Sequence, residues 1–390
     1  MRSIRDLNLE GRAVFLRLDL NVPIKNGTIT SDARIQAAMP TIRHAIDAGA
    51  RVALASHLGR PKGKRVPEMS LEPVGSRLSE ILGKDVVFSE DCIGDGVKRL
   101  MQDLRPGGVL LLENLRYHDG EKKNDAQFAK LLAAPFDAYV NDAFGSCHRA
   151  DASIVGILDY IEDSAAGFLL DKEVAAISKL LQQPKRPFVA VVGGAKVADK
   201  VGVMSSLLDK VDAILVGGAM AYTFLKAKGV EIGKSRCEGD KVYVAKDILD
   251  RAASRKVDIL LPTDHVVAAD FAEDAPAQII TTVAIPQDQM GLDIGPMTRK
   301  VFAERLAGAK TVFWNGPMGV FEWASFAAGT MAIAEAMAGC SGYTVVGGGD
   351  SVAALEKAGC EGKISHVSTG GGASLELVEK GTLPGIDVLK

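Results

Sequence analysis

Arginine and histidine side chains gather where four short apolar segments end in the first half of the sequence. Segment 13–18 leads into RLDLNVP, 51–56 into SHLGRP, 109–112 into ENLRYHDGE and 138–140 into NDAFGSCHRADAS. Guanidinium groups are planar donors suited to phosphates and carboxylates. The pattern predicts that one small, highly charged anion is held by Arg17, Arg34, His57, Arg60, Arg116 and Arg149. The alternative is that each arginine pairs with a nearby carboxylate, as Arg17 would with Asp19.

Two further polar residues follow the first of these segments. Arg17, Asp19 and Asn21 alternate with apolar residues, which places all three on one face of an extended chain. Cys147 beside His148 resembles a nucleophile–base pair, but neighbours on an extended loop point in opposite directions. We therefore expect Cys147 to be a small packing residue.

Glycine-rich turns end five apolar segments in the second half. Segments 188–192, 213–216, 311–314, 343–346 and 364–368 lead into GGAKVADK, Gly217–Gly218, NGPMGVFEW, GGGDS and TGGGAS. Exposed backbone N–H groups at a helix start bind anions, so the pattern predicts a nucleotide-binding cradle. Lys196 and Lys200 are four residues apart, so we expect both to lie on one face of the helix that follows the first glycine pair.

Asp350 stands at a predicted helix start, where it acts either as an N-cap or as a ligand for Mg²⁺. The common nucleotide motifs are missing. Gly233-Lys234-Ser235 lacks the leading glycine of a P-loop, because position 228 is Lys, and Gly347-x-Gly349 ends in Val352 instead of Gly or Ala. Both absences count against a P-loop NTPase and a standard NAD-binding domain.

The elements that position these loops alternate between strand-like and helix-like segments along the whole chain. Alternation of this kind predicts an α/β protein with doubly wound parallel sheets, in which ligands bind at the carboxyl ends of the strands. An amphipathic segment that stops at Pro184 and Pro187 suggests a connector between two domains. We predict a first domain over 1–166, a connecting helix and hinge over 167–187, a second domain over 188–375 and a C-terminal tail over 376–390.

Composition excludes several other classes. The 390 residues are 47% hydrophobic and carry a net charge of -3, which argues against a polybasic nucleic-acid or membrane-surface binder. No apolar segment is long enough to span a membrane, and no secretory signal is visible at the start. Five scattered cysteines indicate reduced thiols, so we expect a cytoplasmic protein. The first 170 residues hold 14 Arg and 8 Lys, and the rest hold 6 Arg and 18 Lys.

Taken together and in order, the eight motifs RLDLNVP, SHLGRP, ENLRYHDGE, NDAFGSCHRADAS, GGAKVADK, NGPMGVFEW, GGGDS and STGGGASLEL resemble the phosphoglycerate kinase family over essentially the whole chain. The resemblance implies two Rossmann-like domains, the first for the triose phosphate and the second for the nucleotide. It also implies reversible phosphoryl transfer between 1,3-bisphosphoglycerate and ADP-Mg, giving 3-phosphoglycerate and ATP, by a monomer whose C-terminal tail returns to the first domain.

The same resemblance assigns the site residues. The substrate-binding set is Asp19, Asn21, Arg34, His57, Arg60, Arg116 and Arg149. The nucleotide-binding set is Gly194, Lys196, Lys200, Gly218, Asn315, Pro317, Glu322, Gly347, Gly348, Gly349, Asp350 and Ser351, with Asp350 placing Mg²⁺. The catalytic set is Arg34, Lys196, Gly349 and Gly371. Departures from the family pattern are small: Ser351 stands where Thr is frequent, Cys147 replaces another small residue, and Ala219 follows a glycine pair where some members have a third Gly.

The proposed chemistry needs no general base, because the acceptor carboxylate, with a pKa of roughly 3.5, is already ionised at neutral pH. Domain closure and charge stabilisation would then carry the reaction. Two alternatives stay open. A dehydrogenase would need a true GxGxxG and a following acidic residue. A non-catalytic phosphate-binding protein is disfavoured because both Lys196 and Arg34 are present.

Overall fold

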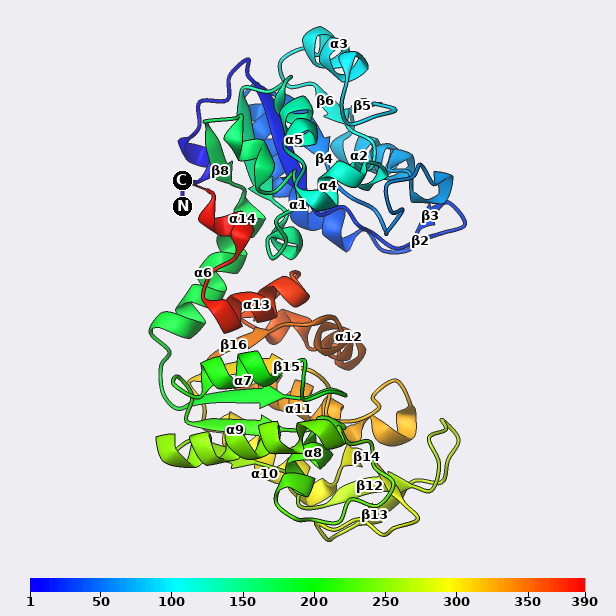
Figure 1. The fold of residues 1–390 in the computed structure, drawn as a ribbon, viewed down its shortest axis with the longest axis vertical. Helices are drawn as coiled ribbons and strands as arrows, with labels where there is room; N and C mark the ends of the chain where they lie inside the picture. Colours follow the sequence, from blue (N-terminus) through cyan, green and yellow to red (C-terminus); the bar gives the residue numbers. More distant parts are fainter. Residues whose placement is uncertain (390) are drawn as a thin grey trace. The chain divides into compact units, whose positions relative to one another are not determined.

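The computed structural model describes residues 1–389, and its internal contacts divide the chain into two units. The first unit comprises Met1–Ala175 together with the segment from Thr382 on, and the second comprises Ala176–Gly381. The boundary falls within helix α6 (Phe168–Gln182) (Figure 1). No helix among the described residues is long and apolar enough to cross a membrane.

The first unit is built on a six-stranded parallel sheet of order β5-β6-β4-β1-β7-β8. The strands are β1 (Ala13–Leu18), β4 (Arg51–Ala55), β5 (Val86–Phe88), β6 (Val109–Leu111), β7 (Ala138–Asp142) and β8 (Ser164–Ala166). A short hairpin is formed by β2 (Ile24–Lys25) and β3 (Thr28–Ile29). The helices are α1 (Ala33–Asp47), α2 (Glu72–Leu82), α3 (Asp95–Asp103), α4 (Asp119–Lys123), α5 (Ala126–Ala133) and α14 (Pro384–Asp387).

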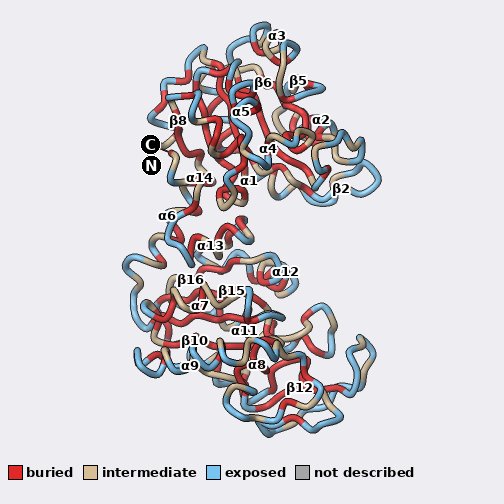
Figure 2. Tube along the Cα trace, viewed as in Figure 1, coloured by how far each residue is buried: buried red, intermediate tan, exposed pale blue. Residues whose placement is uncertain are grey.

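Both faces of this sheet are covered, which explains why its central strands are almost entirely apolar. Along β1, Val14 and Leu16 pack on one face with residues of α1 and α2. On the opposite face, the ring of Phe15 lies 5.1 Å from that of Phe136 and 5.9 Å from that of Tyr139. Figure 2 shows the buried strands in red beneath paler surface loops. The polar residues that follow these strands are therefore carried by a rigid base.

Helix α6 begins against the end of β7. The carboxylate of Asp142 accepts a hydrogen bond from the Leu170 N–H (3.0 Å), and Thr41 Oγ accepts one from the Phe168 N–H (2.9 Å). A side chain at Gly167 would place its Cβ 2.3 Å from Asp142 Oδ1, so only glycine allows this approach. The C-terminal segment joins the same unit, because the Gly385 N–H donates to the Cys147 carbonyl (2.9 Å).

The second unit has its own six-stranded parallel sheet, of order β11-β10-β9-β15-β16-β17. Its strands are β9 (Phe188–Val192), β10 (Ala213–Val216), β11 (Asp258–Leu260), β15 (Thr311–Asn315), β16 (Tyr343–Val346) and β17 (His366–Val367). The helices are α7 (Val201–Leu207), α8 (Met220–Ala227), α9 (Val242–Arg255), α10 (Pro296–Ala307), α11 (Ala328–Gly339), α12 (Gly349–Ala358) and α13 (Gly372–Lys380). Helices α10, α11 and α12 pack on one face through Phe302, Ile333 and Leu355.

The sequence predicts the two parallel sheets, and the α/β fold class is confirmed. It does not predict the antiparallel sheet of order β13-β12-β14, formed by β12 (His265–Ala268), β13 (Gln278–Ile280) and β14 (Met290–Ile294). Strand β13 is largely exposed, so its residues lack the apolar pattern that marks a buried strand. The short edge strands β5 and β8 were likewise not predicted.

The buried carboxyl group of Asp142 stabilises the first unit more at low pH than at neutral pH, which is the reverse of the usual effect of a carboxyl group. Burial raises the pKa of Asp142 from 3.8 to about 6, so the folded state binds this proton more tightly than the unfolded state. Its contribution to stability is therefore fully present below the unfolded pKa and is lost as the pH rises through about 6. We expect the Asp142→Asn variant to gain roughly 3 kcal/mol in unfolding free energy, relative to the wild type, between pH 4 and pH 7.

Urea-induced unfolding of both proteins at the two pH values measures this difference. Asp163→Asn is the control, because Arg12 and Arg2 hydrogen-bond to Asp163 and lower its pKa. Because its pKa lies below the usual 3.8 in the folded state, its stability difference should change little between pH 4 and pH 7. A difference for Asp142→Asn that does not change with pH would mean that this carboxylate ionises in the fold without penalty.

Candidate functional site

Arg17 and His57 form the floor of a basic cluster at the carboxyl ends of the strands of the first unit. Arg17, at the end of β1, is fully buried; its Nε donates to Ser153 Oγ (2.8 Å), and its Nη2 lies 3.3 Å from His57 Nδ1. Since a guanidinium group only donates, His57 Nδ1 accepts, and this assigns the imidazole proton to Nε2. His57 therefore presents an N–H donor on its other side.

Asp19 and Asn21 organise the loop that follows β1. Arg34, from the first turn of α1, donates to Asp19 Oδ2 (2.6 Å), so this carboxylate pairs with Arg34 and not with Arg17. The side-chain oxygen of Asn21 accepts from the Gly59 N–H (2.9 Å). The loop after β1 is thus tied to the loop after β4.

Arg116 and Arg149 come from the loops that follow β6 and β7. Arg116 Nη1 donates to the Gly59 carbonyl (2.7 Å). Arg149 Nε donates to Asp151 Oδ2 (2.8 Å), and its Nη2 donates to Ser146 Oγ (3.0 Å). Each guanidinium group has more donors than these contacts use, so both remain able to bind an anion.

The electrostatics indicate that these arginines lie close together. Burial lowers the pKa of His57 well below its usual value, and the positive charges of Arg17, Arg116, Arg149 and Arg34 lower it further. Burial and the charge of Arg149 also lower the pKa of Arg116 to about 10. Because the clustered cations repel one another, a bound anion would relieve that repulsion.

Most of the residues predicted to hold the anion meet in this cluster, and Arg60 lies beside it as an exposed residue in the same loop as Gly59. Cys147 is fully buried, and burial raises the pKa of its thiol to about 12. It is a packing residue, as predicted, because a thiol that stays protonated is a poor nucleophile.

The loops after β9 and β15 are neighbours in the second unit, at the point where the strand order reverses. Ligands of open α/β sheets bind at such a point. The Gly193 N–H donates to the Asn315 carbonyl (2.9 Å), and the Gly194 N–H donates to the Pro317 carbonyl (3.0 Å). The Gly218 N–H, after β10, donates to the Met318 carbonyl (2.9 Å). Three strand ends therefore form one continuous backbone surface.

The glycines of these loops fall into two groups. A Cβ at Gly193 would lie 2.1 Å from the Pro317 carbonyl oxygen, and one at Gly218 would lie 2.5 Å from the Gly194 nitrogen. These glycines are required because the loops pack on one another. In contrast, a Cβ at Gly349, Gly371 or Gly372 would meet nothing within 4 Å. The open space at the starts of α12 and α13 is where backbone N–H groups remain available to a ligand.

The placement of Lys196 and Lys200 on one helical face is wrong. Helix α7 begins only at Val201, and both lysines lie in the turn before it. The carboxylate of Glu238 accepts hydrogen bonds from the N–H groups of Val197 and Ala198 and holds this turn in a non-helical conformation. Lys196 is exposed, whereas Lys200 is partly buried and donates to the Asn315 side chain.

Asn315 and Ser351 hold the loops around Lys200. Asn315 Nδ2 donates to the Gly347 carbonyl (2.5 Å), and the buried Ser351 hydroxyl accepts from the Gly316 N–H (2.6 Å). Burial lowers the pKa of Lys200, while the charges of Asp199 and Asp350 act in the opposite direction.

A cavity of about 540 Å³ opens onto this surface. The predicted residues that line it are Gly194, Gly218, Pro317, Glu322 and Asp350. The N-cap of α12 is Gly348, so Asp350 is an exposed first-turn residue and the N-cap interpretation of it is wrong. Asp350 lines the cavity, and its role as a metal ligand stays a prediction.

The comparisons with known proteins agree with this geometry. The family model described as phosphoglycerate kinase matches residues 4–381. A phosphoglycerate kinase of Anaeromyxobacter dehalogenans (strain 2CP-C) is 57% identical over 99% of this chain and 98% of its own length. One of Moorella thermoacetica is 53% identical over the same shares. The chain belongs to the phosphoglycerate kinase family.

Solved structures of phosphoglycerate kinases share its fold. The enzyme of Coxiella burnetii superposes with a TM-score of 0.91 at 44% identity, covering 99% of this chain and 98% of that one. The enzyme of Pyrococcus horikoshii OT3 gives 0.85 at 34% identity, covering 100% and 98%. Family membership makes this protein a kinase, that is, a phosphotransferase, and excludes the dehydrogenase alternative.

Sequence reasoning missed the apolar wall of this cavity. It is lined by Tyr222, Phe271, Met290, Leu292 and Val320, with Lys234 and Arg236 at its charged side. Phe271 is 64% exposed, and its ring lies 4.6 Å from that of Trp323. Only Phe271, Met290 and Leu292 come from the antiparallel sheet and the loop after β12, whereas Tyr222 lies in α8 and Val320 in the NGPMGVFEW segment after β15.

A larger open depression of about 790 Å³ lies between the β2–β3 hairpin and α2. Its one arginine, Arg77, already pairs with Asp32 (2.7 Å) and Glu80 (2.7 Å), and its carboxylates outnumber its cations, so the depression does not suit an anion. We therefore place the chemistry in the basic cluster and in the glycine-lined cavity.

The Gly218→Ala variant tests whether nucleotide binding requires the close packing of the loops after β9, β10 and β15. The φ of Gly218 is +66°, and the added Cβ of Gly218→Ala would collide with the loop after β9. We expect a loss of stability of roughly 2–4 kcal/mol, from backbone strain together with overpacking, and weaker ADP binding. Gly229→Ala is the matched control, since its φ is +77° but its Cβ would meet nothing within 4 Å.

Thermal unfolding and titration calorimetry with ADP separate the two effects. The control should lose only about 1–2 kcal/mol and keep its ADP affinity. Equal losses in both variants would show that the contact between the loops is not important.

Proposed function

We propose that this protein transfers a phosphoryl group reversibly between 1,3-bisphosphoglycerate and ADP, giving 3-phosphoglycerate and ATP. The observation that carries the proposal is the pair of anion-binding surfaces, one in each unit and different in kind. The basic cluster suits a small, highly charged acid. The glycine-lined cavity, with its apolar wall, suits a nucleotide.

The triose phosphate is held by Asp19, Asn21, Arg34, His57, Arg60, Arg116 and Arg149. Neutral His57 donates its Nε2–H to a substrate oxygen while Arg17 fixes the ring from behind. Arg116 and Arg149 are oriented by their carbonyl, hydroxyl and carboxylate partners, which leaves donors for phosphate oxygens. Asp19 and Asn21 position the loops that carry Arg34 and Gly59.

The nucleotide lies in the glycine-lined cavity of the second unit. Its adenosine part packs on Gly194, Gly218 and Pro317, with Glu322 at the rim. Its phosphates meet Lys196, Lys200, Asn315 and the α12 start formed by Gly347, Gly348, Gly349 and Ser351. Asp350 is an exposed carboxylate on this cavity and suits Mg²⁺, which takes one or two carboxylates together with phosphate oxygens and neutralises their charge.

The transfer itself needs positioning and positive charge and no proton abstraction. The acceptor is a carboxylate with a pKa of roughly 3.5, already ionised at neutral pH. Arg34 and Lys196 stabilise the charge on the phosphoryl oxygens, together with the backbone N–H groups at Gly349 and Gly371. Because the two substrates belong to different units, we propose that the units close on one another when both are bound, with 167–187 as the hinge.

The domain roles follow from these sites. Residues 1–166 form the triose-phosphate domain and 188–375 the nucleotide domain. Of the predicted tail 376–390, the part from Thr382 on belongs to the first unit and the part before it to the second. We further propose a monomer that works in the cytoplasm on small-molecule substrates and binds neither nucleic acid nor membrane. The five cysteines form no disulfide among the described residues, as expected for a reducing compartment.

A coupled assay with ATP, Mg²⁺ and 3-phosphoglycerate tests the proposal. Turnover should require all three components and stop when 3-phosphoglycerate is omitted. Folded protein that shows no turnover would refute the assigned activity.

Lys196→Ala separates transition-state stabilisation from binding. Lys196 is exposed and tied into no contact that the fold needs, so we expect an unchanged melting temperature, near-normal ADP affinity and a kcat lowered by about 10³-fold. Lys228→Ala, on the same unit away from the loops, is the control and should keep full activity. If the main effect of Lys196→Ala is weaker nucleotide binding, Lys196 binds the nucleotide in the ground state and does not mainly stabilise the transition state.

Arg149→Ala tests the basic cluster. Loss of a charged hydrogen-bond donor typically removes about 1.5–3 kcal/mol of binding, so the KM for 3-phosphoglycerate should rise about 10–100-fold with near-normal ATP binding. Steady-state kinetics in each substrate give both values. Arg105→Ala removes an exposed arginine elsewhere in the unit and should change neither; an unchanged KM for the Arg149 variant would remove that residue from the site.

A further inference from the structure

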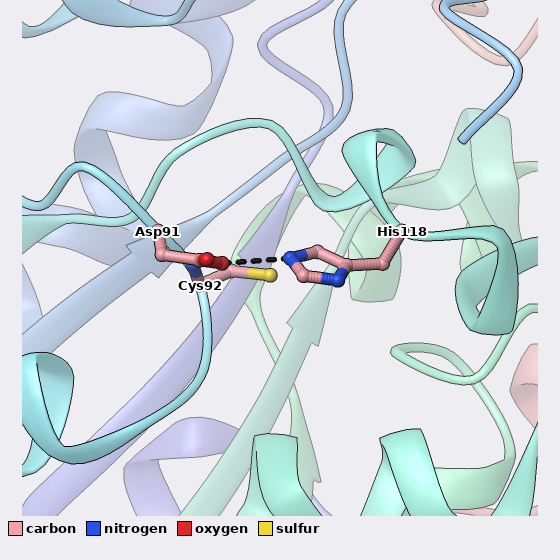
Figure 3. A group of neighbouring side chains, drawn as sticks. All are labelled: Asp91, Cys92 and His118. Atoms are coloured by element: carbon pink, nitrogen blue, oxygen red, sulfur yellow. Dashed lines mark hydrogen bonds and ion pairs between the residues drawn. The ribbon is translucent and has the colours of Figure 1, made fainter. Parts of the chain in front are cut away.

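Asp91, Cys92 and His118 form a cluster of possible metal ligands that the proposed function does not use. His118 Nε2 lies 2.7 Å from Asp91 Oδ1, and the nearest carboxylate oxygen, thiol sulfur and imidazole nitrogen all lie within 4.8 Å of one another. Figure 3 shows the imidazole nitrogen and the sulfur turned toward each other beside the Asp91 carboxylate. The three residues come from two separate loops, after β5 and after β6.

The local structure holds these groups in place. Asp91 Oδ1 accepts a hydrogen bond from the Cys92 N–H (2.6 Å). The His118 ring stacks on Phe128 with centroids 5.2 Å apart and planes at 28°. Cys92 is 1% exposed, whereas the side chains of Asp91 and His118 are 51% and 30% exposed. A cation can therefore approach from solvent and find the sulfur at the inner side of the cluster.

The surrounding charge favours a cation. Burial raises the pKa of the Cys92 thiol well above its usual value, and the negative charges of Asp91 and Glu121 raise it further. A divalent cation would offset this accumulation of negative charge and stabilise the thiolate.

We propose that Asp91, Cys92 and His118 bind a divalent transition-metal cation of the Zn²⁺ class. One sulfur, one nitrogen and one oxygen donor form a three-residue set that leaves one position of a tetrahedron for water. Tetrahedral zinc bonds of about 2.0–2.3 Å separate the ligand atoms by about 3.3–3.8 Å, which small side-chain rotations reach from the present spacing. Mg²⁺ and Ca²⁺ prefer oxygen ligands only, so the cation of the nucleotide site does not compete here.

Binding changes the protonation of the cluster in a defined way. The Cys92 S–H gives its proton to solvent, and the sulfur forms a bond to the metal. In the neutral His118 ring the proton is on Nε2, which donates to Asp91. On metal binding this proton moves to Nδ1 through solvent, the hydrogen bond breaks, and Nε2 and the Asp91 carboxylate both become ligands. One proton is released for each metal bound, so affinity should increase with pH until the thiol is fully titrated.

Cobalt(II) is the probe, because it occupies zinc sites and gives a thiolate charge-transfer band together with visible bands of tetrahedral intensity. Full-length protein, stripped with a chelator, is titrated with Co²⁺ alone in millimolar Mg²⁺. We expect one equivalent to produce both sets of bands and equimolar Zn²⁺ to displace them. Absence of a thiolate band at saturating Co²⁺ would refute the site.

Two variants and two controls assign the ligands. Cys92→Ser should abolish the thiolate band, and His118→Gln should weaken Co²⁺ binding at least tenfold. Cys340→Ser removes another free thiol, and His44→Gln removes another imidazole that packs edge-to-face on a phenylalanine at 5.2 Å; both variants should bind Co²⁺ as the wild type does. If Cys92→Ser fails to fold, the surface variant His118→Gln still decides the question. A thiolate band that persists in Cys92→Ser, or wild-type affinity in His118→Gln, would overturn the assignment.

Discussion

The first unit must hold several positively charged side chains close together, and the rest of its site depends on how the fold does so. The charges of Arg17, Arg116, Arg149 and Arg34 all act on His57, and their combined effect with burial keeps that imidazole neutral. The fold tolerates this repulsion by giving most of these arginines a carboxylate, hydroxyl or carbonyl partner that orients the guanidinium group without using all its donors. The same repulsion makes the cluster selective, because an anion with several charges relieves more of it than a singly charged one does.

The second unit relies mainly on backbone groups where the first unit relies on charged side chains. The surface that we propose for the nucleotide phosphates is mainly backbone, so it needs close approach between loops more than it needs charged side chains. Gly193 and Gly218 allow the loops after β9, β10 and β15 to touch, and Gly349 and Gly371 leave the helix starts uncovered. Side-chain charge is then confined to a few positions, of which Lys200 is partly buried and Lys196 is exposed. This difference between the two units in how they use side-chain charge matches the Arg-rich first half and the Lys-rich second half of the sequence.

The sequence predicted what depends on local pattern and missed what depends on tertiary contact. Parallel strands that are buried on both faces, such as β1 and β9, are marked by continuous apolar residues, and their bounds were predicted to within one or two residues. The motifs also located the loops of both sites. The start of α7 was misplaced because a distant carboxylate, Glu238, holds the preceding turn. The apolar wall containing Phe271 and Met290 was missed because its residues come together from α8, from β14 and from separate loops, and only the tertiary fold brings them to one cavity.

The loop after β6 connects the basic cluster to the Asp91, Cys92 and His118 cluster. Arg116 faces Gly59 and the other cations, whereas His118, two residues later, faces Asp91. The turn between them is stiff, because the Asn114 side chain accepts the Arg116 N–H (3.1 Å) and the Tyr117 hydroxyl donates to the Val66 carbonyl (2.6 Å). A cation that fixed His118 would therefore restrict Arg116 as well. Pre-ordering a donor lowers the entropic cost of binding an anion, so a metal at the proposed site would favour anion binding in the basic cluster through this short turn.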